Sequence, residues 1–594
     1  MLTLAIAQFR PDKGAYARNL ARLGEVFKEV GTWPDPPGLV VAPESALTGY
    51  FLEGGVRDLA LPAEQLFQDL VRVHAESGAP PFDVSLGFYE VYRNHLHNSA
   101  LYASLGGGDA GIRHVHRKVF LPTYGVFDEE RFVEPGQEVA AFDTRWGRAA
   151  MLVCEDAWHS LTPTLAALDG AQLIIVPSAT PARGITAPGN GGRPANLDRW
   201  DRLAQGIAEE HGVFVVVTHL VGFEGGKGFV GGSVLVNPRG QATVHAPLFE
   251  PATVPAVIDF EEITRARAEA PLLSDLRLRL PHLLASLAET RDGGKEDGDE
   301  PETRVKSSAA TPARKVPRPA RAADSLAIDP GLTKRWLVEF IRDEVRRRRR
   351  FSKVVIGLSG GVDSALVAFL AAEALGKDNV TAVRMPYRTS SPDSLEHAQL
   401  VIDQLGVGSR TVDITGAVDG LVAAIGGESS PSRKGNIMAR MRMITLFDLS
   451  AELDALPLGT GNKTERLLGY FTWHADDSPP VNPIGDLFKT QVWALARFVG
   501  VPEVIVTKPA SADLIKGQTD EGDFGISYPK VDQILHGLLT GLRPEEIVAQ
   551  GLTRDEVELV RKRLESTHWK RRLPTVAMLS QTAIGEYYLR PVDF

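Results

Sequence analysis

The first half of the chain alternates short apolar runs with polar or glycine-rich breaks. Each run is bounded by Gly, Pro or polar residues, as β-strands are. Stretches with helical spacing, such as residues 57–76 and 199–210, separate some of the runs. The pattern predicts a layered α/β fold with the strands in the middle. The runs are LTLAIAQF, GLVVAPES, DVSLGFYEV, SALYASL, RAAMLVCED, AQLIIVPS, GVFVVVTHL and GSVLVNP.

The C-terminal part of the chain shows a different alternation, in which a strand is followed by a helix. A helix-like segment, residues 332–350, ends in a run of arginines, which we interpret as a solvated helix end because cations favour a helix C-terminus. The next segments are KVVIGLSGGVDSALVAFLAAEALG, with the pattern of a buried strand, a glycine turn and a helix, and NVTAVRMP, with that of a second strand. This alternation predicts a doubly wound parallel sheet.

Residues 289–324 differ from the rest of the chain because they contain no aromatic residue and almost no large apolar one. The segment is acidic at first, then basic and rich in proline. It has too little apolar surface to offset the entropy lost on ordering, which indicates a flexible linker. We therefore predict an N-terminal domain over residues 1–285, a linker over 286–328 and a C-terminal domain over 329–594.

The bulk composition narrows the classes of function. Apolar residues make up 43% of the 594 residues and charged residues 24%, which is ordinary for a globular protein. A net charge of −10 gives no broad electrostatic case for binding nucleic acid. We expect no membrane span, since no apolar stretch reaches about 18 residues, and no signal core. The single cysteine excludes an internal disulfide and fits the reducing cytoplasm.

That cysteine is Cys154, in MLVCEDAW, at the end of a predicted strand. Alone, it is better interpreted as a small buried hydrophobe than as a nucleophile. A nucleophile needs a base or a cation nearby because the thiolate is the reactive species. Glu44 follows another predicted strand, and Lys118 lies in a basic, aromatic stretch. A carboxylate can take the thiol proton, and a lysine can stabilise the oxyanion of a tetrahedral intermediate.

Three segments, PESALTGY, RKVFLPTYGVFDEERF and LVCEDAWH, are similar to the nitrilase superfamily, in particular to its glutamine-hydrolysing amidase domains. The resemblance covers nearly all of residues 1–260 and implies a four-layer α-β-β-α sandwich. It implies that Glu44 is the base, Lys118 the electrophilic stabiliser and Cys154 the nucleophile. It further implies that Glu129 orients the lysine and that Tyr124 contacts glutamine.

The segment after the cysteine departs from that family. Ser178 and Thr180, in PSATPARGITAPG, stand where the family has two serines, and we take both as glutamine-binding candidates with Tyr124 and Glu129. The downstream basic residue of the family is displaced or missing. His219 occupies a position often filled by Asn, and we interpret it as a packed histidine at a strand end.

The segment GLSGGVDS follows a predicted strand and begins a helix. Backbone N–H groups of such a turn form an anion cradle with the helix N-terminus, although a tight turn that needs glycines would look similar. The lysine of a Walker loop is absent. The segment instead resembles the SGG-x-DS signature of PP-loop ATP pyrophosphatases. That resemblance implies that ATP is bound by Gly357, Leu358, Ser359, Gly360, Gly361, Val362, Asp363 and Ser364.

Further blocks resemble the NAD synthetase family over about residues 330–594. They are GNIMARMRM, PLGTGNKTERLLGYFT, NPIGDLFKTQVWALA, KPASADLIKGQTDEGDFGISY and HWKRRLP. An amidase domain ahead of them resembles the glutamine-dependent branch of that family. The resemblance implies that Thr460, Lys489 and Ser511 contact ATP and that Asp363 and Glu465 hold Mg²⁺. It implies a deamido-NAD site formed by Asn436, Arg440, Glu465, Trp473 and Lys570.

Some positions depart from the synthetase pattern. Trp473 stands where a substrate-binding lysine is common, Pro480 where an acidic residue is common, and Trp569 where a histidine is usual. We hypothesise that Trp473 stacks on the nicotinic ring.

Together, the resemblances imply a ligase of NAD biosynthesis. Glutamine would be hydrolysed to ammonia, ATP would adenylate deamido-NAD, and ammonia would convert the adenylate to NAD, with AMP, pyrophosphate and glutamate as by-products. A homodimer or higher homo-oligomer formed through the synthetase domain is also implied. Two alternatives stay open: the same chemistry on another carboxylate, or an inactive amidase-like half that serves only for oligomerisation.

Overall fold

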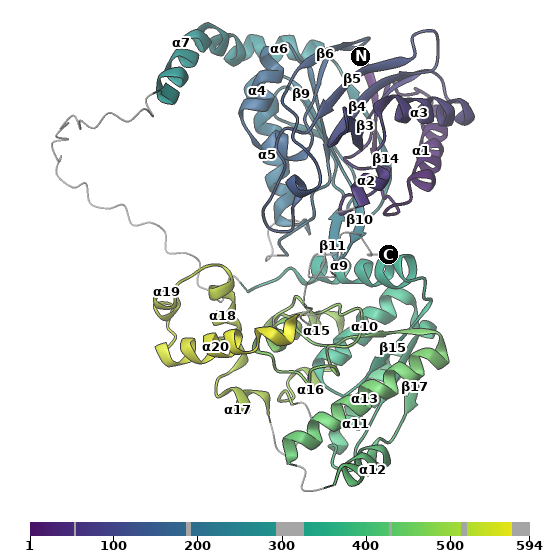
Figure 1. Cartoon of the computed structure of the whole chain (residues 1–594), viewed down its shortest axis with the longest axis vertical. Helices are drawn as coiled ribbons and strands as arrows, with labels where there is room; N and C mark the ends of the chain where they lie inside the picture. The colour runs from purple at the N-terminus through teal and green to yellow at the C-terminus, as the bar shows by residue number, and fades with distance from the viewer. Residues whose placement is uncertain (53–54, 186–191, 293–325, 427–429, 512–518, 573–594) are drawn as a thin grey trace, which may run out of the picture. The chain divides into compact units, whose positions relative to one another are not determined.

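The computed structural model describes the chain except residues 53–54, 186–191, 293–325, 427–429, 512–518 and 573–594. The chain forms two compact units (Figure 1). Apart from the residues just named, one unit comprises residues 1–183 with 195–292, and the other residues 184–194 with 326–572.

The first unit contains two sheets of six strands each. In both sheets a parallel centre is extended at the edges by antiparallel strands. The first sheet has the order β14 (Ala252–Ile258), β1 (Leu2–Gln8), β2 (Leu39–Val41), β3 (Phe82–Tyr92), β4 (His95–Leu105) and β5 (Gly111–Arg117). The second has the order β13 (Ala242–His245), β12 (Val234–Val236), β9 (Phe214–His219), β8 (Leu173–Ser178), β7 (Gly147–Met151) and β6 (Ala141–Thr144).

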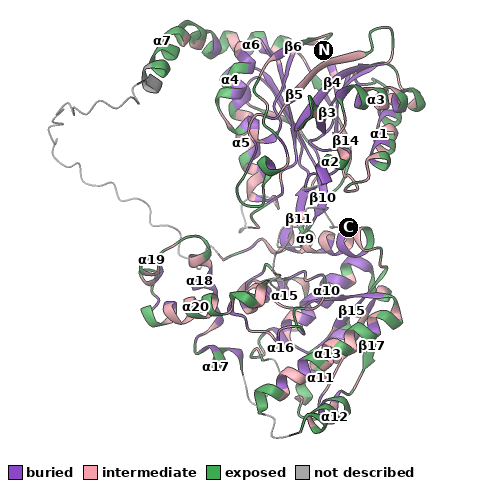
Figure 2. Cartoon of the chain, in the orientation of Figure 1, coloured by how far each residue is buried: buried purple, intermediate pink, exposed green. Residues whose placement is uncertain are grey.

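The two sheets pack face to face, and helices cover both outer faces (Figures 1 and 2). Alternate residues of β1 point to opposite faces, as strand geometry requires. Leu4 and Ile6 join the core shared with the second sheet, whereas Ala5 and Ala7 pack under the outer helices. Helices α1 (Tyr16–Gly31) and α3 (Ala63–Ser77) cover the first sheet; α4 (Leu161–Leu168) and α5 (Ala195–His211) cover the second. The result is the four-layer α-β-β-α sandwich that the resemblance implies.

The predicted helix over residues 57–76 is interrupted. A short helix, α2 (Val56–Leu59), ends before Pro62, and α3 begins at Ala63. Pro62 disfavours helical backbone at the preceding residue and has no N–H to donate. Leu61 instead bridges to Glu90, beside the sheet.

The remaining elements of the first unit complete it. They are β10 (Val221–Glu224), β11 (Lys227–Val230), the 3₁₀ turns η2 (Glu129–Arg131) and η3 (Cys154–Trp158), α6 (Glu261–Glu269) and α7 (Leu272–Asp292).

The second unit is built on a parallel sheet with the order β17 (Gly408–Thr411), β16 (Val380–Arg384), β15 (Lys353–Gly357) and β18 (Ala455–Leu458). Helix α10 (Val362–Leu375) packs on the face that carries Val354 and Ile356. Helix α13 (Pro431–Leu453) packs on the opposite face, against Val355. The sheet is therefore doubly wound, as predicted. The strand order reverses between β15 and β18, which is where such folds bind ligands.

Further helices complete the second unit. They are α9 (Pro330–Arg342), α11 (Pro392–Leu405), α12 (Thr415–Ile425), α14 (Lys463–Leu468), α15 (Lys489–Val499), α16 (Glu503–Val506), α17 (Asp520–Phe524), α18 (Tyr528–Leu539), α19 (Pro544–Val548), α20 (Arg554–Ser566) and the short turns η4 (Asp343–Arg348), η5 (Lys377–Asn379) and η6 (His568–Arg571).

The arginine run is more ordered than a solvated helix end. Helix α9 ends at Arg342, and the chain continues as one π-helical turn, η4. Arg342 and Arg346 donate hydrogen bonds to the last carbonyls of α10, at Ala374 and Leu375. Three more arginines of the run pair with the buried carboxylates of η4. These pairs are Arg347–Asp343, Arg348–Glu344 and Arg349–Glu344.

The predicted linker falls mostly outside the described residues. At its ends, α7 extends to Asp292, and Ile328 is buried in the core of the second unit. The domain boundaries drawn from sequence stay predictions. In the part of the chain that is described, no helix is long and apolar enough to cross a membrane.

Candidate active sites

The ends of three strands in the first unit bring Glu44, Lys118 and Cys154 into one buried cluster. Glu44 follows β2, Lys118 directly follows β5, and Cys154 follows β7 and begins η3. All three side chains are buried. The structure therefore brings together residues that lie far apart in the sequence, as the resemblance implies.

A lysine ammonium lies between two carboxylates at the centre of this cluster. Lys118 Nζ is 2.9 Å from Glu44 Oε1 and 2.7 Å from Glu129 Oε2. Burial alone would lower the pKa of Lys118, but Glu129 and Glu44 raise it well above its usual value. Burial also raises the pKa of Glu129, against the opposing effect of the lysine. Lys118 is therefore a fixed positive charge in a dry site.

Two further donors hold the carboxylates in place. Asn98 Nδ2 donates to Glu44 Oε1 and to Glu129 Oε1, each at 2.7 Å. The backbone N–H of Ala179 donates to Glu44 Oε2 at 2.7 Å. Sequence reasoning did not identify Asn98. It lies in the middle of β4, and only the pairing of β4 with β5 brings it beside Lys118.

The nucleophile candidate lies beside two hydroxyls. Cys154 Sγ is 3.5 Å from Ser178 Oγ and from Thr180 Oγ1, and these hydroxyls are 2.9 Å apart. Burial, with Glu44 as the second cause, raises the pKa of the Cys154 thiol to about 12. The thiol is therefore protonated at neutral pH, and a nearby base must take the proton during attack. Cys154 also has a left-handed backbone, with φ 48°, which is strained for a residue with a side chain.

Tyr124 lies at the exposed edge of the site. Its hydroxyl donates to the carboxylate of Glu155, at 3.0 and 2.9 Å from the two oxygens. Glu155 directly follows the cysteine, and the sequence reasoning gave it no role. Arg183 packs against Gly125 in the same loop: a Cβ atom at Gly125 would lie 3.2 Å from its guanidinium. Charged groups of both signs, Glu155 and Arg183, thus lie beside Tyr124 and Gly125.

His219 is buried at the end of β9. Its backbone N–H donates to Ser233 Oγ at 2.9 Å, and its ring packs edge-on against Trp200. These contacts support the interpretation of a packed histidine.

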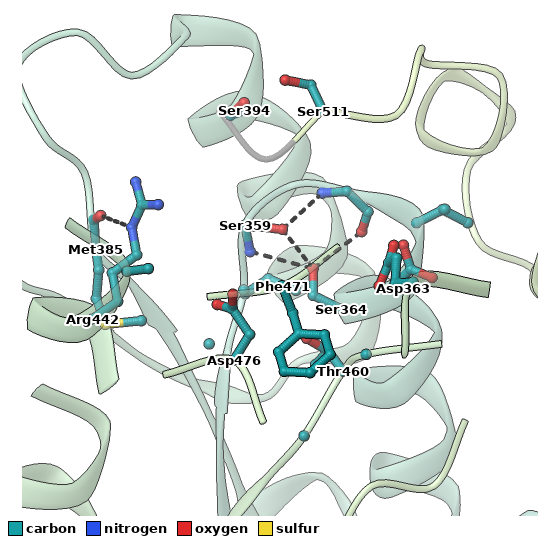
Figure 3. A pocket seen from close by; sticks show the side chains of 18 of the residues that line it. Ser359, Asp363, Ser364, Met385, Ser394, Arg442, Thr460, Phe471, Asp476 and Ser511 are labelled. Atoms are coloured by element: carbon teal, nitrogen blue, oxygen red, sulfur yellow. Dashed lines mark hydrogen bonds between the residues drawn. The ribbon is translucent and has the colours of Figure 1, made fainter. Parts of the chain in front are cut away.

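The glycine-rich segment of the second unit connects β15 to α10 (Figure 3). Ser359 Oγ and Ser364 Oγ are 3.1 Å apart, and Ser359 Oγ accepts the N–H of Gly361 at 3.3 Å. Gly360 has φ 78°, and a Cβ atom there would lie 2.1 Å from the carbonyl oxygen of Ser394. Glycine is required at this position both for its backbone angle and for the close approach.

A second lysine lies between two carboxylates behind this loop. Lys489 Nζ forms an ion pair with Asp363 and lies 3.3 Å from Glu465 Oε1. Asn462 Nδ2 donates to Asp363 at 3.0 Å. Asn462 is also the N-cap of α14, where its side-chain oxygen accepts the backbone N–H of Glu465. Burial raises the pKa of Glu465 to about 8, against the effect of Lys489. Burial would lower the pKa of Lys489, but Asp363 and Glu465 raise it.

Asp363, Glu465 and Lys489 line a cavity of about 470 Å³. Of the predicted ATP-binding residues, Gly360 alone does not line it. The others do: Gly357, Leu358, Ser359, Gly361, Val362, Asp363, Ser364, Thr460, Lys489 and Ser511. The cavity opens at the carboxyl ends of the strands, at the switch point of the sheet.

The predicted deamido-NAD residues, apart from Glu465, do not line that cavity. They gather on residues 469–473, which adjoin it through Tyr470 and Phe471. Lys570 Nζ donates to the carbonyls of Gly469 and Phe471, at 2.8 and 3.0 Å. The other contacts are Asn436 with Thr472, Arg440 with the carbonyl of Trp473, and Trp473 edge-on to Trp569.

The donor set for a metal ion is small. Among the described residues, no group of three or more His, Cys, Asp or Glu side chains is arranged to hold a metal ion. The pair Asp363 and Glu465 nevertheless attracts one positive charge, since Lys489 Nζ lies between them. Mg²⁺ is commonly held by one or two carboxylates together with phosphate oxygens and water, so the pair fits it.

Two family models match the chain: carbon-nitrogen hydrolase over residues 3–268, and NAD synthase over residues 334–574. The NH(3)-dependent NAD(+) synthetase of Chlorobaculum parvum is 48% identical over 261 residues, which cover 44% of this chain and 94% of that protein. The protein of the same name from Fusobacterium nucleatum is 46% identical over 246 residues, which cover 41% of this chain and 95% of that one.

Two solved structures share the fold of nearly the whole chain. A glutamine-dependent NAD+ synthetase from Acinetobacter baumannii, in complex with ADP, has a TM-score of 0.67 and 23% identity, with 98% of this chain and 96% of that chain covered. One from Cytophaga hutchinsonii has a TM-score of 0.69 and 16% identity, with 96% and 93% covered.

The two folds define a two-domain enzyme that joins a carbon-nitrogen hydrolase-like sandwich to a nucleotide-binding domain. The chain belongs to the NAD synthase family. Both resemblances found in the sequence, and the α/β fold class, are therefore confirmed. The roles of individual residues stay predictions.

Proposed function

We propose that this protein is a glutamine-dependent NAD synthetase. One observation carries the proposal: a buried set of Cys154, Glu44 and Lys118 lies in the same chain as an NAD synthase domain. A thiol, a carboxylate and an ammonium are the groups needed to hydrolyse an amide. The second domain uses the ammonia that this hydrolysis releases.

In the first domain, Glu44 accepts the proton of Cys154 as the sulfur attacks the side-chain amide of glutamine. The ammonium of Lys118 stabilises the oxyanion because it is already in place and shielded from water. Ammonia leaves with a proton returned by Glu44, and water then cleaves the thioester to release glutamate. Glu129 holds Lys118 in position through an ion pair, and Asn98 holds Glu44 through a hydrogen bond. Tyr124, Ser178 and Thr180 contact the substrate.

In the second domain, the nicotinic carboxylate of deamido-NAD attacks the α-phosphate of ATP. The glycine-rich loop cradles the departing pyrophosphate with its backbone N–H groups and the serine hydroxyls. Asp363 and Glu465 would hold Mg²⁺, which neutralises charge on the phosphates when bound. Lys489 stabilises the same charge, and ammonia then displaces AMP to give NAD. Segment 469–473 and its neighbours Asn436, Arg440, Trp473 and Lys570 contact deamido-NAD.

The experiment that tests this division compares two nitrogen donors. NAD formation from deamido-NAD and ATP is measured with glutamine or with ammonium, in the wild type and in Cys154→Ala. We expect the variant to lose glutamine-driven synthesis by at least about 10³-fold and to keep ammonium-driven synthesis. Loss of both activities, or of neither, would overturn the assignment.

The choice of acceptor is tested separately. ATP–pyrophosphate exchange that depends on deamido-NAD would exclude a different carboxylate substrate, and a glutaminase assay would exclude an inactive amidase half. Assembly as a homodimer through the synthetase domain and placement in the cytoplasm stay predictions.

A further inference from the structure

Asp156 lies two residues after Cys154 and is completely buried. Its carboxylate accepts four hydrogen bonds. Oδ1 accepts the backbone N–H groups of Val119 and Phe120, both at 2.9 Å. Oδ2 accepts the backbone N–H of Val153 at 3.0 Å and the Nε2 hydrogen of His116 at 2.8 Å.

These donors belong to the two segments that carry the reacting groups. Val119 and Phe120 directly follow Lys118, whereas Val153 directly precedes Cys154. One oxygen of Asp156 therefore holds the backbone after the lysine, and the other holds the backbone before the nucleophile. Hydrogen bonds to an ionised carboxylate are shorter and stronger than neutral ones, so this connection is stiff.

The backbone at the nucleophile needs such a connection. Cys154 adopts a left-handed conformation, and a strained φ persists only where the surrounding structure imposes it. No strand pairing continues through this turn, because β7 ends at Met151. The bond from Val153 to Asp156 closes the turn on its N-terminal side, and the hydroxyl of Thr162 donates to the backbone carbonyl of Asp156 on the other.

We propose that Asp156 is a positioning residue for glutamine hydrolysis, which fixes Cys154 Sγ relative to the ammonium of Lys118 by bonding both backbones at once. This inference rests on the proposed glutaminase activity. Asp156 has no contact with the reacting atoms; it acts through the geometry of the two residues that do.

The test replaces Asp156 by Asn. The asparagine oxygen can accept from only one of the two segments, and its NH₂ group meets N–H donors on the other. We expect glutaminase kcat to fall by about 10²-fold, the cost of a small misplacement of reacting groups. The KM for glutamine should change by less than about 3-fold. Ammonium-driven NAD synthesis should equal that of the wild type, since it does not use this domain's chemistry.

A second readout isolates geometry from stability. Cys154 is the only thiol in the chain, so iodoacetamide labelling reports on it alone. The labelling rate of Asp156→Asn should differ from that of the wild type by about 10-fold or more, because thiol reactivity depends on its immediate surroundings. The matched control is Asp83→Asn. Asp83 is equally buried in the same domain and accepts from Tyr102 and Arg145, but it lies at the start of β3. This control should lower the melting temperature without changing kcat or the labelling rate.

If Asp156→Asn does not fold, variants of His116, the side-chain donor to Asp156, test the positioning role instead. His116→Phe removes one of the four bonds and should lower kcat by about 10-fold, and His116→Gln, which can still donate, should restore part of the loss. The positioning role would be overturned if the kcat of Asp156→Asn lay within about 2-fold of the wild type. If that variant does not fold, the same criterion applies to His116→Phe. Failure of the wild type to hydrolyse glutamine would instead refute the proposed function itself.

Discussion

The two sites of this protein use the same arrangement of charges around a buried lysine, but their carboxylates differ in exposure. Each holds a lysine ammonium between two carboxylates, and in each an asparagine donates to one or both of those carboxylates. In the first domain the side chains are 0–8% exposed, whereas in the second the carboxylates are 18% and 19% exposed. The first set is Lys118, Glu44, Glu129 and Asn98, and the second is Lys489, Asp363, Glu465 and Asn462.

The difference matches what each site binds in the proposed mechanism. Glutamine is neutral at its reacting amide, so the first site can stay dry, and its fixed charges act at full strength on the developing oxyanion. ATP carries several charges, so the second site must exchange its internal ion pairs for contacts with phosphates. A cavity of about 470 Å³ beside the second set leaves room for that exchange. Depth therefore separates a preorganised catalytic charge from an exchangeable one.

The largest contrast should come from removing the buried lysine. Lys118→Met leaves Glu44 and Glu129 facing each other without a counter-charge, which costs about 3–5 kcal/mol of unfolding free energy for a buried pair. Glutaminase activity should fall by at least about 10³-fold, since both the oxyanion donor and the geometry are lost. Thermal unfolding and a glutaminase assay measure the two effects. Normal stability of the variant would show that the cluster is not dry.

Removing the second lysine should affect function more than stability. Lys489→Met is expected to cost about 1–2 kcal/mol, between the values for surface and buried pairs, because water reaches Asp363 and Glu465. NAD synthesis should drop by about 10²-fold or more with either glutamine or ammonium, while glutamine hydrolysis continues. Equal destabilisation in Lys118→Met and Lys489→Met would contradict the proposed difference in depth.

The sequence could predict the candidate reacting residues of both sites but not the residues that hold them in position. Glu44, Lys118 and Cys154 stand in ordered segments at the ends of apolar runs, so their types and positions carry the signal. Asn98 carries none, because its importance depends on the register between β4 and β5, which is set by tertiary packing. Asp156 lies two residues after the cysteine, but three of its four donors, Val119, Phe120 and His116, lie more than thirty residues away in the sequence.

The fold was predictable to a similar extent. Periodicity indicated the strands and both layered architectures, because apolar runs with polar breaks determine which faces are buried. Two local signals were present but not used. Pro62 marks the break between α2 and α3, and the spacing of Asp343 with Arg347 and of Glu344 with Arg348 is that of helical ion pairs.

The asparagines that donate to these carboxylates, Asn98 and Asn462, allow a comparison with smaller expected changes in unfolding free energy. Asn98→Ala removes two hydrogen bonds to buried carboxylates and should cost about 1–3 kcal/mol, with a reduced glutaminase kcat. Asn462→Ala removes the cap of α14 and one bond to Asp363, whose side chain is 18% exposed, and should cost about 1 kcal/mol. Paired unfolding curves for the two variants measure this difference, and a reversed order would contradict it.

The last prediction concerns the pH dependence of the lone thiol, which changes no residue of either charged set. The pKa of Cys154 in the folded protein is about 12, above its ordinary value, because of burial and of Glu44. A raised pKa means that the folded state keeps its proton while the unfolded state loses it, so this contribution to stability is present below about pH 8.5 and is lost as pH rises toward 12. From pH 8 to pH 10 the wild type should therefore lose about 1–2 kcal/mol of unfolding free energy relative to Cys154→Ala. Iodoacetamide labelling of the folded chain should keep rising over the same range, whereas labelling of the denatured chain levels off near pH 9. A plateau near neutral pH in the folded protein would mean that the thiolate forms before glutamine binds, and Glu44 would then not be needed as the base.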